Sequence, residues 1–434
     1  QMRALRHHAS PLMWNYGSDQ PPTPAHLTAY KNIAAALHWQ NPTLDNVATW
    51  SNANAGMKMD GPYKWAPPIL WWNGTSSGSA FGTTGEEGTE APPPAESIRK
   101  FLAPADQWPI GTAFNFHAGK PRSVFDNISM YSNGLNKRYG TASSLDDYSR
   151  KSELMNYENT RAFFEAWSAN EYTKSFGTIF WMQNNSWPSV HWNLYDYFFK
   201  PGGGFYGTKK ANEPAHISYD YAAKKVYVVN STLTPRNLTA TATVYNIPDL
   251  SQKYTTSVPV TATANASTNV LTLPSITGLS TTYFIRLQLH DGGTLVSNNL
   301  YWYSTTPDAL SNKSNWYSTT TKTFANLTGL NSLPVNNSVT STVARTVANG
   351  QETVTITLRN TSATNIAFFM RPEVTSGSNG NEVLPIRYTE NYVSLWPGEQ
   401  TTITATYQTS DLGGQPPHLR VRGYNLPTAN TPIP

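Results

Sequence analysis

The chain has 434 residues, of which 13% are charged and 12% aromatic, with a formal net charge of +4 and no cysteine. The basic residues are scattered among the acidic ones, which argues against a nucleic-acid partner, and the lack of cysteine excludes disulfides and thiolate metal sites within this chain. No stretch is apolar over the roughly 18 residues that a membrane span requires. The length predicts two to four domains, and the many aromatic rings suit a β-rich or carbohydrate-binding protein.

Strands alternate with helices in the first 213 residues. The predicted elements, in chain order, are a strand over 11–16, a helix over 25–39 entered through Pro24, a helix from Glu96 that follows three prolines, a helix over 152–172 and a strand over 178–183. Short strands separated by amphipathic helices are typical of parallel βα units. The first 213 residues are therefore predicted to form an α/β unit.

The pattern changes after Pro214. Short segments rich in threonine and valine follow one another, with turn residues between them. In the segment 283–289, Tyr283, Ile285, Leu287 and Leu289 are expected to face one way while Arg286 and Gln288 face the other, which predicts a strand with one buried face. Two β-sandwiches fit this pattern, so the predicted domains are 1–213, 214–299 and 300–434.

Two acidic residues in the first domain stand where barrel enzymes carry catalytic groups. Asp19 directly follows the first predicted strand, and Glu86 lies in a Gly- and Thr-rich stretch before the proline-led helix. Catalytic groups of barrel enzymes follow the carboxyl ends of the strands, and retaining glycoside hydrolysis requires two carboxyl groups ~5–5.5 Å apart. The residues alone leave another interpretation open, in which Asp19 caps a helix and Glu86 is solvated.

Four long segments of the first domain carry a family resemblance. They are "WNYGSDQPP", "MKMDGPYKWAPPILWW", "SAFGTTGEEGTEAPPPAESIRKF" and "WMQNNSWPSVHWNLYDYFFKPGGGFYGTKKANEP". Together and in this order they resemble the exo-β-D-glucosaminidases of glycoside hydrolase family 2, and the similarity continues more faintly after residue 213. The resemblance implies the C-terminal part of a TIM (β/α)8 barrel, followed by two immunoglobulin-like β-sandwiches.

The resemblance also implies roles for two carboxylates. Asp19, preceded by a serine, matches the family's acid/base; most of family 2 has Asn-Glu at this place, and Ser-Asp marks the glucosaminidase branch. Glu86 matches the nucleophile. Because the local Gly-Glu-Glu-Gly departs from the usual Thr-Glu-Thr-Gly, Glu87 is the alternative nucleophile and Glu90 a third candidate.

Three further residues are candidates for substrate binding. Trp181 matches the tryptophan that forms the floor of the first sugar subsite, with a plain core role as the alternative. Tyr63 is expected to hydrogen-bond the nucleophile or the sugar, or else to shape its Gly-Pro-Tyr turn, and Asn184 is expected to help orient the site. Trp71 and Trp72 are predicted to be buried, with an outer subsite wall as the alternative.

The position of Asp19 bears on the fold. In the family the acid/base follows the fourth barrel strand, and only one strand fits before Asp19. An N-terminal part of the enzyme is therefore expected to supply the first three barrel strands and to bind this chain through a large apolar interface, because half a barrel would expose sheet edges. The chain is then expected to be the C-terminal part of a nicked or otherwise divided enzyme.

The expected function is that of a secreted, extracellular, retaining exo-β-D-glucosaminidase. Such an enzyme removes β-1,4-linked glucosamine from the non-reducing end of chitosan or its oligosaccharides, without a cofactor. The alternatives are another family 2 activity, such as a β-mannosidase, or a non-catalytic carbohydrate-binding protein. The histidines show no spacing typical of a metal site.

Asn-x-Ser/Thr sequons, together with a low Lys and Glu content, favour a secreted and glycosylated protein. The sequons are at Asn73, Asn127, Asn184, Asn230, Asn237, Asn265, Asn312, Asn326, Asn336 and Asn360.

Overall fold

The computed structural model describes residues 1–48, 57–59, 61–73 and 78–434. Within these ranges, the first region contains five short strands in two parallel sheets. Strand β1 pairs with β2, and β3, β4 and β5 form the second sheet in that order. The strands are β1 (Trp14–Asn15), β2 (Thr43–Leu44), β3 (Met57–Lys58), β4 (Gly82–Glu87) and β5 (Ser175–Phe180).

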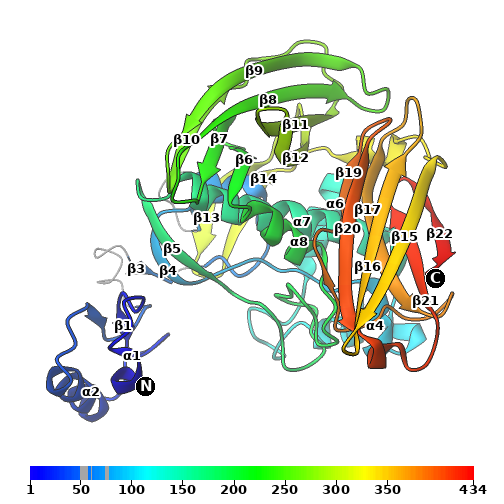
Figure 1. The fold of residues 1–434 in the computed structure, drawn as a ribbon. Helices are drawn as coiled ribbons and strands as arrows, with labels where there is room; N and C mark the ends of the chain where they lie inside the picture. Colours follow the sequence, from blue (N-terminus) through cyan, green and yellow to red (C-terminus); the bar gives the residue numbers. More distant parts are fainter. Residues whose placement is uncertain (49–56, 60, 74–77) are drawn as a thin grey trace.

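Helices precede, connect and follow these strands (Figure 1). They are α1 (Met2–Leu5), α2 (Pro24–Ala36), α4 (Ala95–Phe101), α5 (Thr112–Phe116), α6 (Ser129–Tyr139), α7 (Leu145–Ala169) and α8 (Gly203–Ala211), with 3-10 segments η1 (Pro68–Trp72) and η2 (Pro104–Asp106). Helix α2 starts at a proline, whose fixed φ suits the first helical position. None of the helices in the described ranges is long and apolar enough to cross a membrane.

Helix α7 begins earlier than the predicted residue 152. The Ser144 hydroxyl accepts a hydrogen bond from the Asp147 backbone N–H at 3.2 Å, and Asp146 and Asp147 occupy the first turn. A serine cap followed by acidic residues is a helix-start signal, because it satisfies free N–H groups and complements the helix dipole. The cue for this start was present in the sequence. Helices α1, α5, α6 and α8 are additional to the predicted ones.

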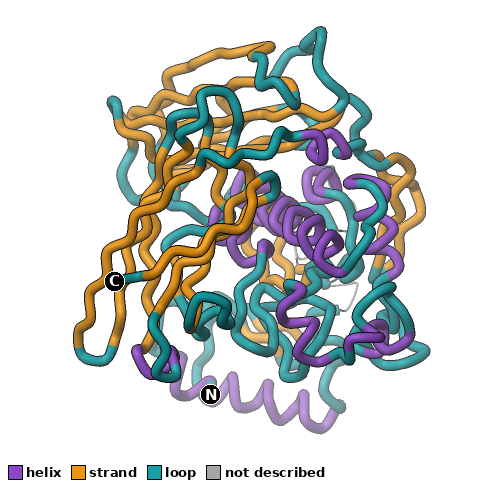
Figure 2. The backbone as a smooth tube through the Cα atoms, turned by 90° about the vertical axis from the view of Figure 1, so that its right-hand side faces the viewer, coloured by secondary structure: helices purple, strands orange, loops and turns teal. Residues whose placement is uncertain are grey.

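Helix α7 lies at the centre of the molecule and is buried on nearly all sides. Its Leu154 and Met155 pack in a core shared with the C-terminal sandwich, whereas Phe163 and Trp167 pack in a core shared with the first sandwich. Figure 1 shows α7 between these two sandwiches, and Figure 2 shows their strands gathered on one side with most helices on the other. The helix thus joins the three parts of the chain.

The first sandwich follows α8. Its sheets have the strand orders β10-β7-β6 and β12-β11-β8-β9, with antiparallel pairing throughout. The strands are β6 (Ala215–Tyr219), β7 (Lys225–Asn230), β8 (Arg236–Asn246), β9 (Gln252–Ala262), β10 (Ala266–Thr272), β11 (Thr282–Asp291) and β12 (Thr294–Ser304). The predicted boundary at 213/214 falls between α8 and β6. The predicted boundary at 299/300 is wrong, because it falls inside β12.

The sequence predicts that one face of β11 is buried, but both faces are. Ile285 and Leu287 are buried in the sandwich core, as expected. The opposite face is also covered: Phe284 packs in the core of the C-terminal sandwich, and the Arg286 guanidinium forms an ion pair with Glu399 of that domain. Strand β11 is therefore covered on both faces because the second sandwich docks on it.

The C-terminal region combines a hairpin with a second sandwich. The hairpin strands are β13 (Ala309–Asn315) and β14 (Ser318–Thr323), followed by η3 (Thr328–Ser332). The sandwich sheets have the orders β15-β16-β20-β18 and β19-β17-β21-β22. Their elements are β15 (Val339–Ala348), β16 (Gln351–Asn360), β17 (Ala367–Ser376), β18 (Arg387–Tyr388), β19 (Val393–Leu395), β20 (Gln400–Gln408), η4 (Thr409–Leu412), β21 (Pro417–Gly423) and β22 (Leu426–Pro432).

Buried polar groups attach α7 to the first sandwich. Arg161 Nη1 donates to Asn299 Oδ1 at 2.7 Å. Glu165 Oε1 accepts from the Tyr301 hydroxyl at 2.7 Å and lies 2.9 Å from His216 Nε2. All five side chains are buried, and breaking such a network leaves uncompensated polar groups. These contacts give His216 a structural role.

Three of the ten sequons form buried turns. Asn230, Asn336 and Asn360 are at most 1% exposed, and each side-chain amide donates to backbone carbonyls. In each case the side-chain oxygen accepts the N–H of the residue two positions later, which is an Asx turn. The Asn-x-Ser/Thr pattern therefore serves the fold at these positions.

Expression in a eukaryotic secretory host is expected to leave Asn230, Asn336 and Asn360 without glycans. Their amide nitrogens are enclosed, whereas Asn265 and Asn312 are exposed. Site-specific mass spectrometry of the folded protein measures the occupancy of each sequon. A glycan on Asn360 of the folded protein would contradict this prediction.

Candidate active site

The end of β4 meets the loop that follows β1. The Ser18 hydroxyl donates to Glu86 Oε1 at 3.1 Å, and the Tyr63 hydroxyl donates to Glu86 Oε2 at 3.0 Å. Tyr63 is buried, and Glu86 is half-buried. The Glu86 carboxylate is thus held between two hydroxyl donors from separate loops, with one side open.

Burial and hydrogen bonding have opposite effects on the pKa of Glu86. Desolvation raises the pKa of Glu86, the hydrogen bonds from Tyr63 and Ser18 lower it, and the negative charge of Asp19 raises it further. The net direction is upward. Asp19 therefore acts electrostatically on Glu86, as two carboxylates in one site do.

Asp19 lies in an exposed loop that is tied to the loop after β2. Its backbone carbonyl accepts from Asn46 Nδ2 at 3.4 Å, and the neighbouring Ser18 carbonyl accepts from Val47 N at 3.2 Å. Gly17 is needed in this turn, because a Cβ there would lie 2.4 Å from the Gln20 carbonyl oxygen. The Asp19 side chain is left at the surface of the site.

The two other acidic residues of the loop point elsewhere. Glu87 is fully buried, and its Oε1 lies 3.6 Å from Lys58 Nζ. Neighbouring strand residues face opposite sides, so Glu86 and Glu87 cannot both face the same opening. Glu90 is also fully buried, where it accepts from Trp65 N at 3.0 Å and meets His191 Nε2 at 3.0 Å. Among these three carboxylates, Glu86 is the one that faces Ser18 and Tyr63.

Trp181 packs directly on the end of β4. Its backbone N–H donates to the Glu87 carbonyl at 2.9 Å, and its side chain is partly exposed. Gly88 allows this approach, because a Cβ on Gly88 would lie 1.9 Å from the Trp181 carbonyl oxygen. The partly exposed indole is therefore placed beside the strand that carries Glu86.

The remaining aromatic and amide candidates lie in different surroundings. Trp71 and Trp72 are 1% and 7% exposed, and Trp71 Nε1 donates to Asn159 Oδ1 at 2.8 Å, so their predicted burial is confirmed. Asn184 is exposed and lines a cavity with Tyr195 and Phe205 whose lining, within the described ranges, includes neither Asp19 nor Glu86. No described contact joins Asn184 to Glu86.

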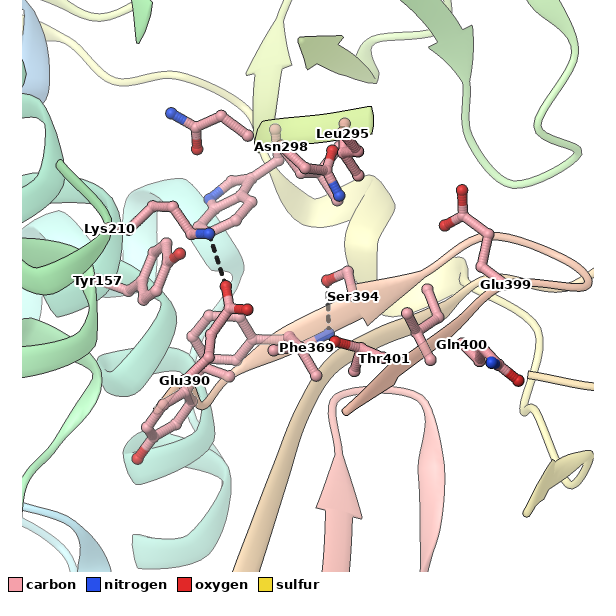
Figure 3. Close-up of a pocket in the computed structure, with 16 residues that line it drawn as sticks. Tyr157, Lys210, Leu295, Asn298, Phe369, Glu390, Ser394, Glu399, Gln400 and Thr401 are labelled. Carbon is pink, nitrogen blue, oxygen red and sulfur yellow. Dashed lines mark hydrogen bonds and ion pairs between the residues drawn. The ribbon is translucent and has the colours of Figure 1, made fainter. Parts of the chain in front are cut away.

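A second cavity, of about 250 Å³, lies where α7, α8, β12 and the C-terminal sandwich meet (Figure 3). Lys210 reaches its edge and pairs with Glu390 at 2.6 Å and with Glu213 at 2.8 Å. Among the described residues that line this cavity, none is a predicted site residue. Lys210 and Glu390 neutralise each other, and Glu399, which also lines the cavity, is paired with Arg286. The cavity is therefore a domain junction and not the carboxylate site.

Two contributors to the site were missed from the sequence. Ser18 was noted only as a neighbour of Asp19, although its hydroxyl bonds Glu86. Tyr317, at the tip of the β13–β14 hairpin, accepts the Tyr63 N–H through its carbonyl. A backbone contact from a distant hairpin leaves no side-chain signal in a sequence.

Two domain families match the β-rich part of the chain. Residues 223–306 match the mannosidase Ig/CBM-like domain, and residues 316–426 match the exo-β-D-glucosaminidase Ig-fold domain. The first match extends through all of β12 and so crosses the predicted boundary at 299/300.

Two curated relatives match almost the whole chain. The exo-β-D-glucosaminidase of Streptomyces avermitilis is 39% identical over 449 residues, which cover 99% of this chain and 49% of that protein. The exo-β-D-glucosaminidase of Amycolatopsis orientalis is 37% identical over 449 residues, with 99% of this chain and 43% of that protein covered. This chain is a homologue of the exo-β-D-glucosaminidases. It spans about half the length of these curated relatives.

Solved structures show the same relationship. The exo-chitosanase CsxA of Amycolatopsis orientalis matches with a TM-score of 0.90 at 36% identity, over 99% of this chain and 52% of that one. Two structures of CsxA are complexes with PNP-β-D-glucosamine, one of an aspartate-to-alanine variant and one of a glutamate-to-alanine variant. The β-D-mannosidase from Dictyoglomus thermophilum, at 17% identity and a TM-score of 0.68, shares the fold.

Proposed function

We propose that this chain carries the catalytic carboxylates of a retaining exo-β-D-glucosaminidase that removes β-1,4-linked glucosamine from the non-reducing end of chitosan. The observation that carries the proposal is Glu86, held by Ser18 and Tyr63 and influenced by the charge of Asp19. Homology over nearly the whole chain supports it. The CsxA complexes with PNP-β-D-glucosamine supply the substrate class.

In this mechanism Glu86 is the nucleophile and Asp19 the acid/base. An oxygen of Glu86 attacks the anomeric carbon while the glycosidic bond breaks, and Asp19 transfers a proton to the departing oxygen. Water then enters, loses its proton to Asp19 and displaces Glu86, which restores both groups. The Tyr63 hydroxyl orients the nucleophile, and Trp181 offers its partly exposed ring as the floor for the sugar.

The substrate's own charge fits this pair of groups. A glucosamine unit carries a protonated amine beside the reacting carbon, and two neighbouring carboxyl groups favour that cation over a hydroxyl or an acetamide. Burial around Glu86 strengthens the attraction, because it lowers the local dielectric. We therefore propose that selectivity for the amino sugar is local to Asp19 and Glu86.

We further propose that β1 to β5 are the fourth to eighth strands of a (β/α)8 barrel. The five strands are parallel within their sheets and follow chain order. On β5, the apolar side chains of Phe176 and Ile179 are 61% and 65% exposed, as expected of a surface that another part of the enzyme covers. An N-terminal part of the same enzyme would supply those strands. Loss of activity on separating the two parts, and its recovery on mixing them, would test this proposal.

A β-mannosidase is the second candidate, because residues 223–306 match a mannosidase domain. Hydrolysis of paired aryl β-glycosides of glucosamine and mannose by the intact enzyme separates the two. We expect a strong preference for the glucosaminide. A preference for the mannoside would overturn the proposed substrate, and sugar binding without turnover would identify a non-catalytic protein.

The proposed site of action is extracellular, since chitosan is a polymer that does not enter cells. Fractionation of a culture of the producing cells, followed by an assay for glucosaminidase activity in medium and cell extract, tests this. Activity confined to the cell extract would contradict it.

Gly88→Ala is expected to lower kcat/KM about 100-fold, because a displacement of roughly 1 Å at a reacting group has an effect of this size. The new Cβ would lie 1.9 Å from the Trp181 carbonyl oxygen and push the subsite floor away from β4. Gly177→Ala on neighbouring β5 is the matched control, since its Cβ would meet only Thr83 Cγ2, at 3.7 Å. Equal losses in the two variants, measured on an aryl glucosaminide, would contradict the prediction.

A further inference from the structure

The tip of the β13–β14 hairpin contacts the turn that carries Tyr63. The Tyr317 carbonyl accepts two backbone hydrogen bonds, from Tyr63 N at 3.0 Å and from Lys64 N at 2.9 Å. The hairpin belongs to the segment between the two sandwiches, far along the chain from this turn. These two bonds satisfy the backbone N–H groups of the turn and hold it against the hairpin tip.

The fit between hairpin and turn is close. Gly61 adopts a φ of +63°, and a Cβ there would lie 2.3 Å from the Trp316 carbonyl oxygen. The Trp316 ring packs edge-on against Tyr63 at 6.0 Å and against Phe125 at 5.9 Å between centroids. Trp316 nevertheless remains 56% exposed. Its ring therefore packs on the turn and is not part of a buried core.

Tyr63 is held from a second side as well. Trp192 Nε1 donates to the Tyr63 carbonyl at 2.7 Å, and the Trp192 ring packs edge-on against Tyr63 at 6.5 Å. With its backbone held by the hairpin and by Trp192, the Tyr63 hydroxyl is aimed at Glu86 Oε2, 3.0 Å away. The hairpin tip is therefore connected to the carboxylate through Tyr63: Tyr317 binds the backbone of Tyr63, and the Tyr63 hydroxyl binds Glu86.

We propose that the β13–β14 hairpin tip is a positioning element of the active site, in which Trp316 and Tyr317 hold the Gly61–Lys64 turn so that the Tyr63 hydroxyl stays on Glu86. Trp316 is a positioning residue here and does not contact the reacting atoms. This inference rests on the proposed function, since it assigns a second layer of support to the same nucleophile. It gives the hairpin that follows the first sandwich a supporting role, in which it fixes the geometry of a residue that contacts the nucleophile.

The pH profile reports on this contact. Among the described residues, the titratable groups that act on Glu86 are Tyr63 and Asp19. The hydrogen bond from Tyr63 lowers the pKa of Glu86, so its loss raises that pKa. Glu86 must be ionised to attack, and the acidic limb of kcat/KM then moves to higher pH. Loosening the hairpin should produce the same movement as removing the Tyr63 hydroxyl.

A double-mutant cycle in the intact enzyme tests the proposal. Tyr63→Phe is expected to lower kcat on an aryl glucosaminide roughly tenfold, and Trp316→Ala roughly three- to tenfold, both with the acidic limb shifted upward. The double variant should match Tyr63→Phe within about twofold, because both changes act on one contact. Trp316→Phe should retain most activity. Leu233→Ala, at an 87% exposed position on the β7–β8 loop, is the control and should change nothing.

Several outcomes would overturn the proposal. Additive effects would show that Trp316 acts independently of Tyr63. A loss confined to KM that grows with oligosaccharide length would identify Trp316 as a sugar-stacking surface instead. Hydrogen exchange at the Gly61–Lys64 turn provides a readout without turnover: faster exchange in Trp316→Ala supports the clamp, and unchanged exchange refutes it. If the wild-type enzyme did not hydrolyse glucosaminides, the proposed function would be wrong. The hydrogen-exchange experiment would still test the contact between hairpin and turn, because it does not require turnover.

Discussion

Replacement of Glu86 by alanine is expected to remove nearly all hydrolysis, because no other described group is placed to form the covalent glycosyl intermediate. Glu87 and Glu90 cannot substitute for it, since both are buried and face Lys58 and His191, respectively. Replacement of Asp19 by alanine is expected to lower turnover by ~10²–10⁴-fold, the usual contribution of general acid–base catalysis. The loss should shrink on a nitrophenyl glycoside, whose leaving group departs without a proton.

Azide separates the two roles stereochemically. In Asp19→Ala, azide should capture the glycosyl intermediate and give the β-azide. In Glu86→Ala, azide should attack the β-glycoside directly and give the α-azide. Product configuration is measured by NMR of the isolated glycosyl azide.

The control for this pair is Glu87→Gln, which keeps the shape of the buried side chain. Its thermal transition should fall, because Lys58 loses a buried charge partner, yet catalysis by the folded fraction should persist. Loss of turnover in Glu87→Gln with full activity in Glu86→Ala would reverse the assignment. Full activity of Asp19→Ala on chitosan oligomers would remove Asp19 from the mechanism.

Arg138→Met is expected to destabilise the fold by about 3–5 kcal/mol, the cost of breaking a buried ion pair from one side. Arg138 on α6 is 1% exposed, and its guanidinium meets Glu158 of α7 at 2.6 Å and Asp308, just before β13, at 3.1 Å. The variant leaves two carboxylates buried without their cation. Burial already raises the pKa of Asp308, and the charge of Arg138 opposes that rise.

Urea unfolding followed by near-UV circular dichroism measures the loss through the transition midpoint. Arg99→Met is the control, because its partner Asp146 is 71% exposed and surface pairs contribute about 0–1 kcal/mol. A triple variant, Arg138→Met with Glu158→Gln and Asp308→Asn, should recover most of the stability. It retains acceptors for the Tyr139 hydroxyl and the Ala325 N–H and buries no charge. An Arg138→Met midpoint equal to that of Arg99→Met would contradict the prediction.

The sequence contained enough to place the two carboxylates at strand ends. Asp19 and Glu86 each close an apolar or Gly/Thr-rich run before a proline-led helix. Glu86 lies near the end of β4, and Asp19 lies in the loop that follows β1, which ends at Asn15. It did not distinguish Glu86 from Glu87. Two adjacent glutamates leave the strand alternation ambiguous. Only the contacts in the folded chain separate them, because Glu87 pairs with buried Lys58 whereas Glu86 accepts hydrogen bonds from Ser18 and Tyr63.

The misplaced boundary at 299/300 has a similar cause. The segment around Asn298 and Asn299 resembles a turn in composition, yet both residues lie within β12. Asn299 is buried because Arg161 and Glu165, from α7, satisfy its amide. Polar residues in a strand become compatible with burial only when another domain provides their partners.

Local pattern by itself determined the α/β character of the first region, the β-rich character of the rest and the types of residue available for chemistry. Those features depend on periodicity and turn residues that lie near one another in the chain. Only the tertiary structure decided which hydroxyls hold Glu86, why α7 is buried on nearly all sides and how the β13–β14 hairpin reaches Tyr63. Each of these is a contact between segments distant in sequence, where burial and geometry, and not the local pattern, select the partner.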